Sequence, residues 1–241
     1  MRALALLGVL AAQACSEDGP QVRVFAAASL REVVDDMAED FEAAHPQWSV
    51  RAVYAGSQTL RLQAEAGASF DLFMSAHAEH LDRLHASGRC DPPRVMAGNR
   101  LALVVPEGSS TEDLEGLAKA ERIVLGSREV PLGRYTEEFL GRAARTYGEN
   151  WAHQVRDQVA SRERSARLVR AKLSLGEAGA AIVYATDADG LSMRRIPIED
   201  GLNPRANYVA ASSSELGRRF LAWVEGPKGR ARLAERGFLP P

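Results

Sequence analysis

The sequence lacks several features that mark large classes of proteins. It has only 2 cysteines in 241 residues, so a framework of disulfide bonds is not expected. The 30 basic and 32 acidic residues leave a formal net charge of -2, without the basic excess that nucleic-acid binding usually needs. Neither the G-x-S-x-G nucleophile pattern nor the G-x-x-x-x-G-K-[ST] phosphate loop occurs. We therefore expect no nucleic-acid partner, no hydrolase of that kind and no nucleotide-binding loop.

What is present is the composition of an ordinary folded protein. Hydrophobic residues make up 46% of the chain and charged residues 26%, with 20 glycines and 11 prolines. A chain of this length can build one large domain or two lobes of about 100 residues each. The order of strand-like and helix-like segments has to decide between the two.

The first 15 residues, MRALALLGVLAAQAC, have the pattern of an export signal. Arg2 precedes an apolar run that is shorter than the roughly 18 residues of a membrane helix, and no other stretch approaches that length. Cys15 stands where a lipoprotein carries its acylated first residue, which would tether the chain to the membrane. The sequence leaves open whether Cys15 is lipidated or pairs with Cys90, the other cysteine. We expect the protein to act in the periplasm or outside the cytoplasmic membrane.

From residue 22 onward, strand-like and helix-like segments alternate. Val22–Ala26 is strand-like, and the next segment carries apolar residues at helical spacing: Leu30, Val33, Val34, Met37 and Phe41. The alternation continues with strands at 50–55 and 71–75 and helices at 59–66 and 77–85. Short apolar strands separated by helices predict an α/β fold with a mostly parallel sheet covered on both faces.

A second series of such segments predicts a second lobe. Apolar strands are expected at 101–105, 122–125, 181–184 and 195–198, with helices at 135–147 and 166–175. A strand at 208–211 and two C-terminal helices follow the loop 200–207, which is the expected second crossing between lobes. We therefore assign residues 22–98 and 209–241 to one lobe and residues 99–208 to the other.

Two serines follow strands at the starts of predicted helices. Ser29 lies in AAASL (26–30), where the N-cap of the next helix is expected, and Ser57 follows Gly56 at the next junction of this kind. Ligands of open α/β sheets bind beyond the carboxyl ends of the strands, and a helix N-terminus can hold an anion without any lysine or arginine. Each serine could equally do no more than cap its own helix, so both interpretations stay open.

Three junctions in the second lobe have a similar character. They are VPLGRY (130–135), the helix start near Ser165 and Ala166, and Tyr184 at the end of a strand. A turn without function explains the first equally well, and a tyrosine at a strand end is usually a packing residue.

Seven segments resemble one family, in the same order along nearly the whole chain. They are VFAAASL (24–30), YAGSQTL (54–60), FDLFMSA (70–76), GNRLALVVP (98–106), VPLGRY (130–135), GEAGAAIVYATDA (176–188) and EGPKGRARLAERGF (225–238). They resemble the periplasmic molybdate-binding proteins of ABC transporters, the ModA family. The resemblance implies a two-lobed, type II periplasmic-binding fold that closes on molybdate or tungstate. It also implies a monomeric receptor, not an enzyme, with no cofactor and with an ABC permease as its partner.

The resemblance also implies a set of ligand-binding residues. Ser29 and Ser57 match the two serines that donate to the oxyanion, and Tyr184 matches the tyrosine whose hydroxyl completes the shell. Leu132 stands where the family has a small residue that offers its backbone N–H, and Ala166 stands where a valine usually does so. Backbone donors tolerate a change of side chain, so the replacements at 132 and 166 need not abolish binding.

The chemistry of an enclosed anion agrees with this set. A buried dianion loses its hydration, and neutral donors at helix ends can replace it. A cavity that offers only donors should favour fully deprotonated tetrahedral oxyanions over phosphate, which retains a proton. Sulfate has to be discriminated by the size of the cavity alone.

Other interpretations remain to be tested. A metal site at His77, His80 and His85 is disfavoured, because the first two lie about 60 degrees apart on a helix and the third about 140 degrees further round, so we expect surface histidines. A protein of the same fold could bind sulfate, ferric ion or a small organic anion, although the tyrosines that ferric binders place together are scattered here. A lipid-anchored sensory domain without a transport role is a third alternative.

Overall fold

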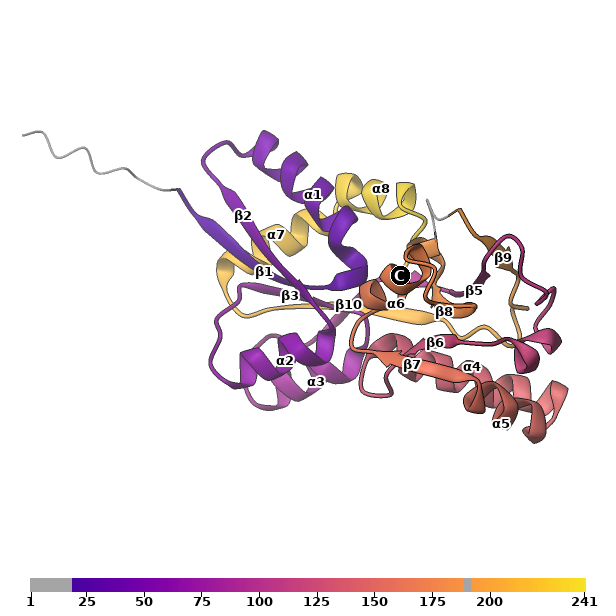
Figure 1. The fold of residues 1–241 in the computed structure, drawn as a ribbon. Coiled ribbons are helices and arrows are strands. Elements are labelled where there is room, and N and C mark those ends of the chain that lie inside the picture. The colour runs from indigo at the N-terminus through magenta and orange to yellow at the C-terminus, as the bar shows by residue number, and fades with distance from the viewer. Residues whose placement is uncertain (1–18, 189–191) are drawn as a thin grey trace, which may run out of the picture.

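The computed structural model describes residues 19–188 and 192–241. Within these ranges the chain forms two five-stranded sheets, each with its own helices, in an elongated molecule (Figure 1). The export signal and Cys15 lie outside the described residues. No helix in the described ranges is both long and apolar enough to cross a membrane.

The first sheet has the strand order β2-β1-β3-β10-β4. β1 runs parallel to β2 and β3, whereas β10 runs antiparallel to β3 and β4. Its strands are β1 (Gln21–Ala27), β2 (Ser49–Ala55), β3 (Leu72–Ser75), β4 (Arg94–Asn99) and β10 (Ala206–Ser212). The helices that accompany it are α1 (Arg31–Ala44), α2 (Ser57–Glu65), α3 (Ala78–Ala86), α7 (Glu215–Val224) and α8 (Pro227–Glu235), and the 3-10 turn η1 (Ala28–Leu30) leads into α1.

The second sheet has the order β7-β6-β8-β5-β9. β6 runs parallel to β7 and β8, and β5 runs antiparallel to β8 and β9. Its strands are β5 (Leu101–Val105), β6 (Ile123–Gly126), β7 (Val159–Glu163), β8 (Ala180–Tyr184) and β9 (Arg194–Ile196). Its helical elements are α4 (Pro131–Tyr147), α5 (Glu149–Asp157), α6 (Ala166–Ser174), η2 (Glu115–Lys119) and η3 (Ala185–Ala188).

The chain passes between the sheets twice, from β4 to β5 and from β9 to β10. The Asn203 side chain joins the two passages: its Oδ1 accepts from Leu101 N and its Nδ2 donates to Leu101 O, both at 2.9 Å. The two-lobed α/β fold is confirmed, but each sheet is mixed, because β5 and β10, the strands that follow the passages, run against their neighbours. β10 begins at Ala206, slightly ahead of the lobe boundary that we placed at 209.

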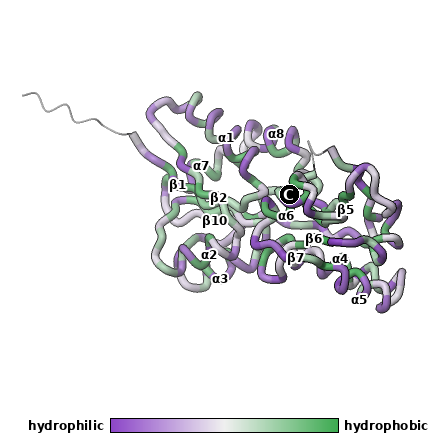
Figure 2. Tube along the Cα trace, in the orientation of Figure 1, coloured by the Kyte–Doolittle hydropathy of each residue, from purple (hydrophilic) through white to green (hydrophobic). Residues whose placement is uncertain are grey.

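Helix α1 shows why the sequence pattern identifies its helices. Val33, Val34, Met37 and Phe41 are all buried, and they form the expected stripe against the sheet. The outer helices change between hydrophilic and hydrophobic residues along their length, whereas β6 is largely hydrophobic (Figure 2). Burial of the apolar stripe is the main contribution that fixes each helix on its sheet.

One glycine determines where α4 begins. A Cβ on Gly133 would lie 1.9 Å from the Ser127 carbonyl oxygen, so only glycine lets the first turn of α4 approach the loop after β6 this closely. Pro131 occupies the first turn of the same helix, where its missing N–H leaves no hydrogen bond unmade. These two residues place the N-terminus of α4 next to the carboxyl end of β6.

Candidate functional site

A small cavity lies where the two lobes meet, at the starts of several helices. Its volume is about 20 Å³. By the same measure of volume, a cavity needs about 10–15 Å³ to hold one water molecule. All five predicted residues line it: Ser29 and Ser57 from the first lobe, and Leu132, Ala166 and Tyr184 from the second. The structure thus brings the predicted residues together from both lobes, at a cavity suited to a compact ligand.

Four of the five residues stand at the beginnings of helical elements. Ser29 lies in the η1 turn that leads into α1, Ser57 and Ala166 are the first residues of α2 and α6, and Leu132 follows Pro131 in α4. The first N–H groups of a helix have no partner within the helix, and the helix dipole makes this end positive. The cavity is therefore surrounded by backbone donors and by positive ends of helices.

The two serines do not cap their helices. Ala27 is the N-cap of η1 and Gly56 that of α2, and neither helix has a side-chain cap. The expectation that Ser29 occupies the N-cap is therefore wrong, because the strand runs into a 3-10 turn before α1 starts. Ser165 is a true cap by contrast, since its Oγ accepts from Leu168 N at 3.3 Å. The hydroxyls of Ser29 and Ser57 are left for another role.

The hydroxyl groups at the cavity are buried and differ in their partners. Ser57 Oγ accepts a hydrogen bond from Ala76 N at 3.2 Å. Ser29 Oγ lies 2.8 Å from the hydroxyl of Tyr208, a residue of β10. The Tyr184 hydroxyl has no hydrogen-bond partner among the described residues, although Tyr184 is only 1% exposed. Burial raises the pKa of Tyr184 well above its usual value, so the hydroxyl is neutral and keeps its proton for a donor role.

No lysine, arginine or histidine is among the described residues that line this cavity. The charged groups lie further out and join the lobes: Glu32 of α1 pairs with Arg167 of α6, and Glu79 of α3 pairs with Arg134 of α4. Gln58 Nε2 also donates to Arg164 O across the lobes at 2.9 Å. The interior of the site is thus uncharged, and the ion pairs hold the lobes together around it.

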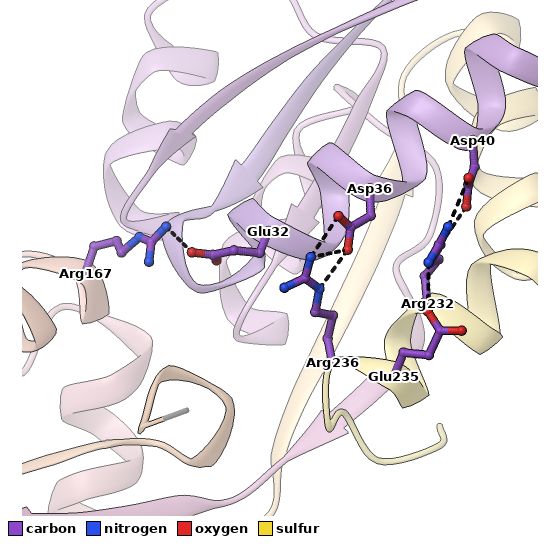
Figure 3. A network of polar contacts seen from close by, with 7 residues as sticks. All are labelled: Glu32, Asp36, Asp40, Arg167, Arg232, Glu235 and Arg236. Atoms are coloured by element: carbon purple, nitrogen blue, oxygen red, sulfur yellow. Dashed lines mark hydrogen bonds and ion pairs between the residues drawn. The ribbon is translucent and has the colours of Figure 1, made fainter. Parts of the chain in front are cut away.

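Helix α1 presents three acidic residues at four-residue spacing, shown in Figure 3. Glu32 reaches Arg167 in the other lobe, whereas Asp36 and Asp40 pair with Arg236 and Arg232 of the neighbouring C-terminal segment. Only the first of these pairs crosses between the lobes, and its acid, Glu32, lies three residues after Ser29 in the chain.

A larger crevice of about 280 Å³ adjoins the site and shares Ser29 with it. Its wall includes Glu32, Arg170, Arg236 and Asp187. Asp187 is 4% exposed, and its Oδ2 has no hydrogen-bond partner among the described residues. Burial raises the pKa of Asp187 to about 7, against the opposing effect of Arg167 and Arg170. The carboxyl group is therefore largely protonated below neutral pH.

The histidines are only partly where the sequence suggested. His80 is 2% exposed and not on the surface, because α3 packs that side against the lobe, and burial lowers its pKa to about 4. In the described ranges, no group of three or more histidine, cysteine or acidic side chains is arranged to hold a metal ion. Cys90 is a free thiol there, half-buried, and burial raises its pKa to about 11.

Sequence reasoning missed Tyr208 and Asp187 as neighbours of the site. Tyr208 lies in a buried apolar strand and gives only a packing signal, and Asp187 reads as a surface acid in a polar segment. Their relation to Ser29 arises only when the lobes are assembled.

Two α/β lobes joined by two passages, with a small donor-lined cavity between them, define a solute-binding protein. Residues 22–239 match the family model of bacterial extracellular solute-binding proteins. The chain is 32% identical to the molybdate-binding protein ModA of Haemophilus influenzae, over 90% of this chain and 89% of that one. The chain belongs to this family of extracellular solute-binding proteins, among the relatives of ModA.

Solved structures agree on the fold. The periplasmic molybdate-binding protein of Azotobacter vinelandii superposes with a TM-score of 0.79 at 17% identity, covering 91% of this chain and 99% of that one. The sulfate-binding protein SubI of Mycobacterium tuberculosis superposes with a TM-score of 0.80 at 15% identity, covering 92% and 87%. At these identities the superpositions establish the architecture alone.

Proposed function

We propose that the protein is an extracytoplasmic receptor that captures molybdate or tungstate between its lobes and delivers it to an ABC permease. The observation that carries the proposal is the buried Tyr184 hydroxyl, which has no partner in the described chain and lines one cavity with the two serine hydroxyls. A buried donor without a partner is destabilising, and an anion that accepts from it removes that cost. The names of the ModA relatives supply the choice of molybdate or tungstate.

The residues at the cavity favour binding over catalysis. Its donors are the hydroxyls of Ser29, Ser57 and Tyr184 and the N–H groups near Leu132 and Ala166. None of the side chains that line it in the described part of the chain is a carboxylate, imidazole or amine that could act as a general base near neutral pH. We therefore infer that the protein is not an enzyme, needs no cofactor and returns its ligand unchanged.

On charge alone, the same donors would bind sulfate as readily as molybdate. Both anions present only acceptors, and the fold is shared with the sulfate-binding SubI. Phosphate near neutral pH carries a proton that would face a donor, so it should bind poorly. Sulfate is thus the second candidate, and the two are separated by measurement of affinity.

Further parts of the proposal concern assembly and location. We propose that the receptor is a monomer, that residues 22–98 with 209–241 and residues 99–208 move as its two lobes, and that Cys15 is acylated and tethers the chain to the membrane. Mass spectrometry of the mature chain from membranes would show a lipid on Cys15 or a free N-terminus. Sedimentation would show one copy or more.

Isothermal titration of the purified chain with molybdate, tungstate, sulfate and phosphate tests the function. We expect tight binding of molybdate or tungstate, weaker binding of sulfate, and no measurable binding of phosphate. Ser57→Ala should weaken molybdate binding by about 5- to 150-fold, the equivalent of about 1–3 kcal/mol for a lost buried donor. Ser174→Ala is the matched control, because its hydroxyl donates to Arg170 O further along α6. A tight response to phosphate alone would overturn the ligand assignment.

A further inference from the structure

Tyr208 holds its hydroxyl directly behind the cavity. The side chain is fully buried in β10 and packs edge-on against Tyr184 and Phe238, with ring centroids 5.6 Å and 5.3 Å away. Its hydroxyl lies 2.8 Å from Ser29 Oγ, and Ser29 lines the cavity. Only one of these two hydroxyls can donate in that hydrogen bond, so its direction decides what Ser29 can offer to a ligand.

The burial of Tyr208 bears on this direction. Burial raises the pKa of Tyr208 well above its usual value, so the phenol keeps its proton, and a buried O–H requires an acceptor. Asn99 Oδ1 already accepts a hydrogen bond from Arg100 N at 2.8 Å, and Asn99 Nδ2 donates to Thr186 Oγ1 at 2.9 Å, so both polar atoms of this amide have other partners. Ser29 Oγ lies at hydrogen-bonding distance from the Tyr208 hydroxyl, at 2.8 Å, and by geometry either hydroxyl could supply the proton of this bond. When Tyr208 donates, Ser29 accepts, and the proton of Ser29 is left to point toward the cavity.

Ser57 shows the same arrangement with a backbone donor. Ala76 N donates to Ser57 Oγ at 3.2 Å, so one lone pair of this oxygen is also occupied from inside the protein. A serine hydroxyl has one proton and two lone pairs. When an internal donor occupies the oxygen, the proton of the serine is the part left for the cavity.

We propose that Tyr208 is a positioning residue that fixes the Ser29 hydroxyl as a donor toward a bound oxyanion. The inference rests on the proposed function and adds a source of selectivity to it. Without Tyr208 the Ser29 hydroxyl could rotate and accept a proton from an anion that carries one. With Tyr208 in place, an anion that presents only acceptors gains the hydrogen bond, and hydrogen phosphate meets a second donor.

Tyr208→Phe separates this role from simple packing, because phenylalanine keeps the ring. Titrations at about pH 8 with molybdate, sulfate and phosphate should show molybdate binding weakened about five- to tenfold, as expected for one misdirected hydrogen bond. The ratio of the phosphate to the molybdate dissociation constant, measured by competition where phosphate binds weakly, should fall. An equal change for both anions would indicate a general structural effect and would overturn the proposal.

A double-mutant cycle tests whether Tyr208 acts through Ser29. In a Ser29→Ala background, Tyr208→Phe should change molybdate affinity less than twofold, because the hydroxyl that it positions is gone. Multiplicative losses in the double variant would contradict the proposal. Tyr147→Phe, which removes a hydroxyl outside the cavity, controls for the loss of a tyrosine and should alter neither affinity nor the ratio.

Neutron diffraction from deuterated wild-type crystals gives a readout that needs no variant. A deuteron on the Tyr208 oxygen, directed at Ser29 Oγ, supports the proposal, and a deuteron on Ser29 directed at Tyr208 overturns it. Wild-type protein that binds none of the oxyanions would refute the proposed function and this inference together. Wild-type protein that binds molybdate, beside a Tyr208→Phe variant with unchanged affinity and ratio, would refute the inference alone.

Discussion

Tyr184→Phe should reduce ligand affinity without reducing the stability of the free protein. The hydroxyl of Tyr184 contacts no hydrogen-bond partner in the described chain, so its removal breaks no bond within the protein. The ring is retained, and with it the contact with Tyr208. A hydrogen bond to a charged acceptor contributes about 1.5–3 kcal/mol, so molybdate affinity should fall about 10- to 150-fold.

Calorimetric titration gives the affinity, and thermal unfolding with and without molybdate gives the stability. The melting temperature of the free variant should not fall below that of the wild type, because removal of the hydroxyl breaks no hydrogen bond within the protein. The upward shift caused by ligand should shrink in proportion to the weaker binding. Tyr147→Phe, outside the cavity, is the matched control for both measurements. Wild-type affinity in Tyr184→Phe would refute the reasoning, because the hydroxyl could not then contact the ligand.

Three further variants test the surroundings of the site. Burial raises the pKa of Asp187 from 3.8 to about 7, so near neutral pH the folded carboxyl keeps a proton that the unfolded chain has lost, and this difference lowers the stability of the folded protein. The loss of stability is absent below about pH 4, grows up to about pH 7 and is constant above it. Asp187→Asn should therefore raise the free energy of unfolding by on the order of 1–4 kcal/mol at about pH 8 but hardly at about pH 4. Denaturant titrations at the two pH values measure this, and an equal gain in stability at both pH values would contradict the reasoning. Glu79→Gln removes the ion pair with Arg134 across the lobes, so molybdate affinity should become less sensitive to salt, and an unchanged salt dependence in titrations would count against the pair. Gly133→Ala places a Cβ 1.9 Å from a backbone oxygen and should lower both melting temperature and affinity, whereas Gly141→Ala in the same helix, with nothing within 4 Å, should lower neither.

The parts of the fold that the sequence predicted are those with strong burial. Helix α1 and strands β1, β5 and β8 have clear apolar patterns, because each faces a core on at least one side. β4 and β7 were not predicted, and both lie at an edge of their sheet. An edge strand has one neighbour and is partly exposed, so VASRE of β7 has no apolar run to reveal it. Helix α5 was missed because the helix predicted from the sequence ends at Tyr147, just before Gly148. In the structure Gly148, at a φ of 92°, ends α4, and α5 begins at the next residue.

The candidate site was predictable to a similar extent and for a related reason. Ser29, Ser57 and Ala166 lie where strand or loop runs into helix, and that junction is visible locally in the sequence. Tyr208 is 179 positions away from Ser29 in the chain and reaches it only through the pairing of β10 with β3. Such contacts depend on the assembled sheet, and no local pattern predicts them.

The arrangement of charge explains why closing of the lobes should depend on a ligand. The ion pairs Glu32–Arg167 and Glu79–Arg134 form across the lobes, but they are only partly buried, and pairs in contact with solvent stabilise by only about 0–1 kcal/mol each. Closing without an anion would bury the Tyr184 hydroxyl and the first N–H groups of several helices unpaired, at about 1–3 kcal/mol for each group. The unpaired donors outweigh the ion pairs, so closure is unfavourable until an anion accepts from the donors. Selectivity and closure then have the same physical origin, because an anion that fails to satisfy the donors also fails to close the lobes.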